Sequence, residues 1–190
     1  MEIVMNLSLI LNLPFSASAW TQLQEKELSI PMLAWALVVP LSFLPPVLMY
    51  YAGSHYGDDF LPGFHDKNWH FITTTLFLAE LLTFFVMGWL IHSVLEVYNI
   101  STDYHYTYLI AAIAPLPLWL SSLALLVPIL WLNVVIVGAA LLLSSILVYQ
   151  GCKALNKNTG DDMISMSATY TIIAASFLAW FLLLLLVWAY

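Results

Sequence analysis

The stretch that most constrains this chain is residues 114–133, APLPLWLSSLALLVPILWLN, an apolar run interrupted by proline. It is too long and too apolar for a helix of a soluble domain, and Pro115 and Pro117 each remove one backbone donor. In hydrocarbon the freed carbonyls need other donors, so we expect this segment to lie among helices or beside a polar cavity. Pro128 ends the run and a second run follows at once, which predicts a membrane hairpin with Trp131 near the interface.

The composition extends this interpretation to the whole chain. It is 63% hydrophobic and only 8% charged, unlike a soluble domain, and 190 residues leave no room for a catalytic head beside several spans. We therefore predict an all-α integral membrane protein, with an amphipathic segment at 1–30 and one membrane domain at 31–190. Its five transmembrane helices, the first and third kinked, are expected near 31–53, 69–98, 106–127, 129–149 and 165–190.

The amino-terminal segment imitates a secretory signal but lacks its charge pattern. Ala17-Ser-Ala19 follows an apolar stretch, yet Glu2 stands where a signal peptide carries basic residues. Trp20 and Leu23 are three residues apart and are followed by charged side chains, which predicts a short helix in the headgroup layer. A frayed tail is the alternative.

Two later segments carry further local signals. In the first span Pro45 is followed by Pro46, which predicts a break in its outer half and a wall for any internal cavity. In the fourth span, residues 138–140 offer small side chains for close helix packing. Cys152 opens an expected polar loop that reaches Ile164, and as the single cysteine it permits no internal disulfide.

The loop expected between the first two spans concentrates imidazoles and carboxylates. These are ligand types for zinc, manganese or nickel, but their spacing matches no ligand motif and the neighbouring glycines and proline are typical of turns. A solvated loop is the favoured interpretation, a metal site is the alternative, and we expect no cofactor. The side chains concerned are His55, Asp58, Asp59, His65, Asp66 and His70.

Glu80 lies near the middle of the second span, where an ionised carboxylate is costly. No lysine or arginine lies at that depth, so we expect Glu80 to be protonated, to face the bundle interior and to donate one hydrogen bond. His92 and Glu96, four residues apart, are expected to share one face near the opposite interface. Four partners for Glu80 are open: Ser121, Ser122, Asn133 and Tyr170.

Several short sequence motifs, taken together, resemble those of the Yip family in its bacterial inner-membrane branch. Two positions differ from the family pattern, Ser122 in place of glycine and Gln150 in place of a basic residue. The resemblance runs through Trp20, His55-Tyr-Gly57, Met87-Gly-Trp-Leu-Ile-His92, Pro115-Leu-Pro-Leu-Trp-Leu120, Leu126-Val-Pro-Ile-Leu-Trp-Leu-Asn133 and Tyr149-Gln-Gly151. Its helix-kink motif comprises Pro115, Pro117, Trp119, Pro128, Trp131 and Asn133.

The resemblance implies a multi-spanning membrane protein that is not an enzyme. Eukaryotic members bind Rab GTPases in vesicle trafficking, whereas the bacterial branch has no such partners and no settled biochemical role. The compact length favours the bacterial branch. We therefore expect lipid, other membrane proteins or a second copy as partners. With four lysines and no arginine, the chain has no basic stripe for nucleic acid.

Two other function classes stay open. One is a small transporter or metal-handling protein that uses Glu80 and the outer histidine loop, although no paired intramembrane charge accompanies this residue. The other is an intramembrane enzyme, for which the sequence has no serine–histidine, paired-aspartate or HExxH arrangement at membrane depth.

The lysines predict the orientation of the chain. With the amino terminus in the cytoplasm, Lys26, Lys153 and Lys157 lie inside and only Lys67 lies outside, which follows the positive-inside bias. Five spans then place the carboxyl terminus outside.

A reporter protein fused after Tyr190 tests this orientation. We expect signal from a reporter that is active only outside the cytoplasm. Signal from a reporter that is active only in the cytoplasm would contradict the predicted orientation.

Overall fold

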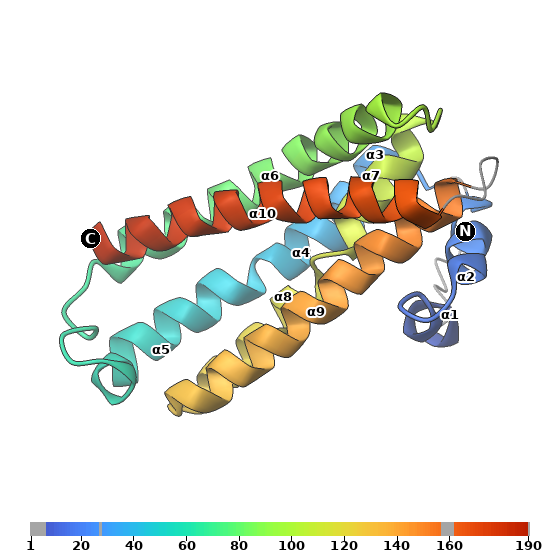
Figure 1. Ribbon diagram of the computed structural model, residues 1–190. Helices are drawn as coiled ribbons and strands as arrows, with labels where there is room; N and C mark the ends of the chain where they lie inside the picture. Colours follow the sequence, from blue (N-terminus) through green and yellow to red (C-terminus); the bar gives the residue numbers. More distant parts are fainter. Residues whose placement is uncertain (1–6, 27, 157–161, 190) are drawn as a thin grey trace.

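The computed structural model describes residues 7–26, 28–156 and 162–189, and within these ranges every regular element is helical (Figure 1). Five helices are long and apolar enough to cross a membrane, which confirms the predicted all-α architecture of five spans. The ends of successive spans alternate between two ends of the bundle, so the 61–68 loop, which the lysines predict to be the outer loop, lies far from the amino-terminal helices. Lys157 and Tyr190 lie outside the described residues.

The elements follow one another in a simple order. Two short helices, α1 (Leu7–Asn12) and α2 (Ala17–Gln24), precede the spans. The spans are α3 (Ile30–Leu33), the π-helical turn η1 (Ala34–Val38), α4 (Val39–Ser42) and α5 (Leu44–Phe60); α6 (Trp69–Val97); α7 (Tyr104–Ile113), α8 (Leu116–Ser121) and the 3₁₀ turn η2 (Ser122–Leu126); α9 (Leu130–Leu155); and α10 (Asp162–Ala189).

The first span is irregular, as the sequence predicted. Its π-helical turn lies just before Pro40, where the missing N–H and the ring disturb the preceding turn. The helix is interrupted at Phe43, and Pro45 and Pro46 follow in the first turn of α5, where the missing N–H of a proline removes no helical hydrogen bond. Helix α5 then continues to Phe60, with a kink at Tyr56.

Two helices extend beyond the predicted limits of their spans. Helix α5 includes His55, Asp58 and Asp59, which were expected in a loop. The chain kinks at Tyr56, and the next residue, Gly57, packs against the following loop. A side chain there would bring its Cβ within 2.8 Å of the His65 backbone nitrogen. Helix α9 likewise carries Cys152, which is buried and does not open a polar loop.

The third span is the centre of the bundle. Half of its most apolar window is buried, against 22–28% for the other four spans. Helix α7 ends at Ile113 and the chain turns through Pro115 before α8 begins, which confirms the predicted kink. The hairpin at Pro128 is also present, because α9 begins two residues later at Leu130.

Glycines allow the neighbouring helices to approach this central span. A Cβ on Gly88 of α6 would lie 2.7 Å from the Tyr108 ring, and one on Gly151 of α9 would lie 2.8 Å from Ile110. Gly138, which was expected to support close packing, has open space where its side chain would be. Close packing on α9 therefore occurs at Gly151, near its carboxyl end.

The short helix expected before the first span is present as α2, but protein covers its apolar side. Trp20 is fully buried, and its indole Nε1 donates to the Leu13 carbonyl at 3.0 Å. Leu23 is also buried, and α2 packs beside the end of α9 (Figure 1). The stripe that the sequence assigned to the headgroup layer therefore holds α2 against the bundle.

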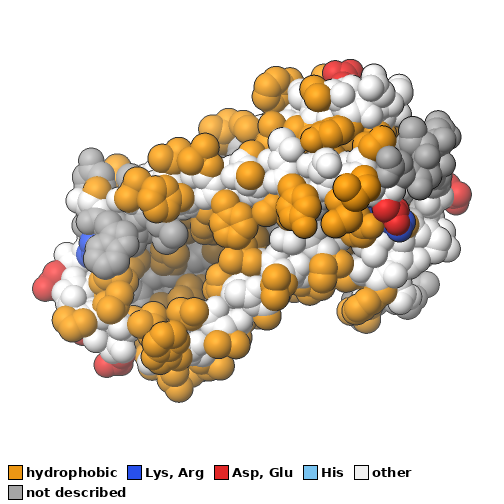
Figure 2. Space-filling view, in the orientation of Figure 1, with side chains coloured by type: hydrophobic (Ala, Val, Ile, Leu, Met, Phe, Trp, Pro, Cys, Tyr) orange, Lys and Arg blue, Asp and Glu red, His pale blue; other side chains and the backbone are white. Residues whose placement is uncertain are grey.

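The surface of the spans is apolar. Figure 2 shows hydrophobic side chains over the length of the visible face, with acidic groups gathered at its two ends. Large side chains such as Trp35 and Trp131 are about three-quarters exposed, at 75% and 76%. An exposed apolar surface of this extent is typical of lipid contact.

Candidate functional site

Glu80 is a buried carboxylic acid near the middle of α6. It lies on the buried face of α6 with Leu76 and Phe84, and 7% of its surface is exposed, so it faces the interior as expected. The Trp119 indole of α8 lies beside its carboxyl, but in a geometry outside that of a hydrogen bond. Both carboxyl oxygens are buried and have no hydrogen-bond partner.

None of the four predicted partners reaches Glu80. Ser121 and Ser122 donate to the carbonyls three residues before them, at 2.7 and 2.6 Å. The Asn133 amide donates to the Val127 and Ile129 carbonyls, both at 3.0 Å. Tyr170 is 65% exposed. The prediction of an interhelical hydrogen bond to one of these side chains is therefore wrong, because three of them serve nearby backbone.

Side chains from other helices donate hydrogen bonds to backbone carbonyls of the kinked third span. Where α7 is interrupted, the Ala114 carbonyl accepts a hydrogen bond from Ser144 of α9 at 2.6 Å. Where η2 ends, the Leu125 carbonyl accepts one from Tyr56 of α5 at 2.8 Å. Two backbone carbonyls of the interrupted span therefore accept hydrogen bonds from other helices, as expected for a segment that lies among helices.

The sequence did not identify either donor. In the sequence, Ser144 is one of two adjacent serines in an apolar helix, and Tyr56 is the central residue of the motif His55-Tyr-Gly57. Neither pattern indicates a hydrogen-bond donor to the third span. Tyr56 also leaves helical geometry, with φ −147° and ψ 33°, which redirects the last turn of α5. A hydrogen bond across 69 residues has no signal in a single sequence.

The imidazoles and carboxylates near the outer loop take separate local partners. Asp58 Oδ1 accepts from the backbone nitrogens of Gly63 and His65 at 2.9 and 3.2 Å, and so folds the loop over the end of α5. His55 lies against Ser54 and its own helix, and His70 Nε2 lies 3.1 Å from the Tyr50 hydroxyl.

The remaining acids of this region, Asp59 and Asp66, are exposed. Among the residues that the structure describes, no three histidine, cysteine, aspartate or glutamate side chains gather at a distance that could hold a metal ion. The loop residues are therefore not brought together, and Asp58 has a structural role that spacing alone did not show.

A second polar cluster lies at the opposite end of the bundle. His92 is buried, its Nε2 lies 3.3 Å from Glu96, and its ring stacks on Tyr104 of α7 at 3.8 Å between centroids. The prediction that His92 and Glu96 share a face is confirmed.

Asp103 caps the amino-terminal end of α7. Its carboxyl accepts hydrogen bonds from His105 in the first turn of this helix, and these bonds lower the pKa of the carboxyl.

The chain was compared with known protein families, curated proteins and solved structures. The Yip1 domain family model matches residues 12–190, which include α2 and all five spans. No curated protein and no solved structure matches the chain.

The environment of Glu80 predicts an unusual stability effect. Because neither carboxyl oxygen has a partner, Glu80→Leu removes a buried polar group without leaving another one unpaired. We expect this variant to be more stable in detergent than the wild type by about 1 to 3 kcal/mol, whereas Glu80→Gln should stay close to the wild type.

Reversible unfolding of the three proteins in mixed micelles measures this difference. A Glu80→Leu variant that is less stable than Glu80→Gln would mean that the carboxyl has a partner in the bilayer. Trp119→Phe is the companion variant, because it removes the one indole N–H beside this carboxyl.

Proposed function

Since this chain belongs to the Yip1 family, we propose that it is a non-enzymatic protein of a bacterial inner membrane that binds other membrane proteins or organises the membrane around it. The family match includes all five spans, so the role that we propose resides in the membrane domain itself. The lysine distribution supports an amino terminus in the cytoplasm and a carboxyl terminus outside.

The observation that carries this proposal is how the chain uses its polar side chains at membrane depth. Ser144, Tyr56 and Asn133 donate to backbone carbonyls of the kinked third span and the following hairpin. Hydrogen bonds of this kind maintain a broken backbone in hydrocarbon. They support a scaffold that presents an apolar surface.

The surface offers ample area for such a partner. Outside the third span, fewer than a third of the residues in the most apolar window of each span are buried within the chain. Side chains exposed by more than half occur on several spans, so that lipid and protein partners can both contact them. They include Trp35, Leu82, Leu120, Val135 and Leu178.

Site-specific photocrosslinking in native membranes tests the proposal. A photoreactive residue is placed in turn at Trp35, Leu82, Leu120, Val135 and Leu178, one exposed position on each span. We expect a discrete protein adduct, or a dimer of this chain, at positions on one side of the bundle and only lipid adducts on the other. Lipid adducts alone at all five positions would contradict partner binding.

Purified protein in proteoliposomes provides the second measurement. We expect no uptake of zinc, manganese or nickel above that of empty vesicles. Uptake that is lost in Glu80→Gln, with the protein still folded, would contradict the proposal and favour a transporter.

A further inference from the structure

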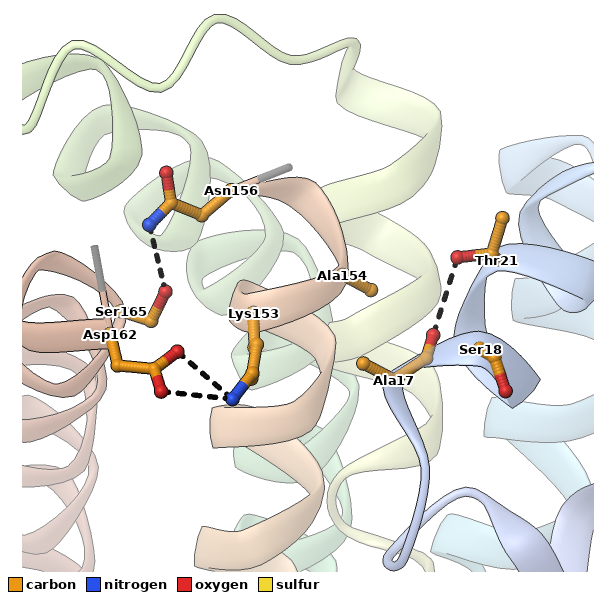
Figure 3. A pocket seen from close by; sticks show the side chains of 8 residues that line it. All are labelled: Ala17, Ser18, Thr21, Lys153, Ala154, Asn156, Asp162 and Ser165. Atoms are coloured by element: carbon orange, nitrogen blue, oxygen red, sulfur yellow. Dashed lines mark hydrogen bonds and ion pairs between the residues drawn. The ribbon is translucent and has the colours of Figure 1, made fainter. Parts of the chain in front are cut away.

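An open pocket lies at the end of the bundle where α2 meets the adjoining ends of α9 and α10 (Figure 3). Its volume is about 410 Å³, which is within the range of small-molecule sites. It is separate from Glu80 and from the outer loop. The lining residues are Ala17, Ser18, Thr21, Lys153, Ala154, Asn156, Asp162 and Ser165.

One cation and one anion stand side by side on the α9–α10 wall of this pocket. Lys153 Nζ lies 2.9 Å from Asp162 Oδ1 and 3.1 Å from Oδ2. The two side chains are 39% and 61% exposed, so both charges are accessible from the pocket and from water. An exposed ion pair of this kind contributes little to stability and can exchange partners at little cost.

Uncharged polar groups complete the walls. On α2, Ser18 and Thr21 carry hydroxyls, and Figure 3 shows this helix on the side of α9 toward which Ala154 points. On the other side the Asn156 amide donates to Ser165 Oγ at 3.1 Å, which fixes the end of α9 to the start of α10. Polar side chains therefore lie on both sides of the pocket, and none of its lining residues is aromatic.

The position of the pocket indicates the source of a ligand. It lies where α9 ends, where α10 begins and where the short helix α2 packs beside α9, at the level where lipid head groups meet a membrane protein. Ala17 and Ala154 contribute apolar surface beside the charges. A molecule with a polar head and apolar chains fits this boundary.

We propose that this pocket binds the head group of a phospholipid that carries both a phosphate and a primary ammonium, as in phosphatidylethanolamine. Lys153 bonds the phosphate and Asp162 bonds the ammonium, so each charge of the original ion pair is paired again. A free phosphate ion that bound Lys153 would take from Asp162 the cation with which it is now paired. A choline head group has no N–H to donate, and the pocket has no aromatic cage for it.

Native mass spectrometry of the full chain in detergent tests this site. The probes are phosphatidylethanolamine, phosphatidylcholine and phosphatidylglycerol with identical acyl chains. We expect phosphatidylethanolamine to bind about tenfold more tightly than phosphatidylcholine, because only its ammonium donates hydrogen bonds to Asp162. Equal binding of these two lipids would overturn the proposal.

Variants of Lys153 and Asp162 test the role of each charge separately. Asp162→Asn should abolish the preference for phosphatidylethanolamine over phosphatidylcholine, and Lys153→Met should weaken binding of all three lipids. The exchanged variant, Lys153→Asp with Asp162→Lys, keeps both charges and should keep the preference if it folds. Lys67→Met, at the opposite end of the bundle, is the control and should bind as the wild type does.

Soluble phosphoethanolamine and inorganic phosphate distinguish a lipid from a free anion. We expect neither, at millimolar concentration, to displace bound phosphatidylethanolamine. Displacement by phosphoethanolamine would show a site for the free head group, and displacement by phosphate would show an anion site. Either result, or unchanged lipid binding by Lys153→Met, would overturn the assignment to a lipid.

Discussion

Backbone hydrogen bonding inside the bilayer is the constraint on which this structure depends. The third span is broken near Pro115 and Pro117 and changes to a 3₁₀ turn before Pro128, so it cannot satisfy all its carbonyls by itself. Ser144 donates to the Ala114 carbonyl and Tyr56 to the Leu125 carbonyl. The broken span is stable in the membrane because α5 and α9 supply these donors.

The packing of the bundle follows from the central position of that span. Gly88 and Gly151 let α6 and α9 come close enough to contact Tyr108 and Ile110 of α7. The same approach brings Ser144 of α9 to the kink. Glycine packing and serine donation are thus two results of one arrangement, in which the kinked third span lies against α6 and α9.

The sequence predicted the larger features because they depend on long patterns. Sustained apolar runs and three prolines were enough for five spans, the central kink and the Pro128 hairpin. The predictions from the sequence failed for residues whose type is compatible with two different structural roles. Gly57 was taken for a turn residue but lies within α5 and packs against the following loop, and three of the four partners proposed for Glu80 are bonded to nearby backbone. Such choices depend on what lies opposite in space, which one sequence does not contain.

Adjacent serines on α9 offer the most direct test of this account. Ser144 donates to the broken third span, whereas Ser145 donates to the Leu141 carbonyl of its own helix at 2.8 Å. Reversible unfolding in mixed micelles should show that Ser144→Ala loses about 1 to 2 kcal/mol of stability, because it leaves the buried Ala114 carbonyl unpaired. Ser145→Ala should stay close to the wild type. Equal stability of the two variants would contradict the claim that donors from neighbouring helices hold the kinked span in place.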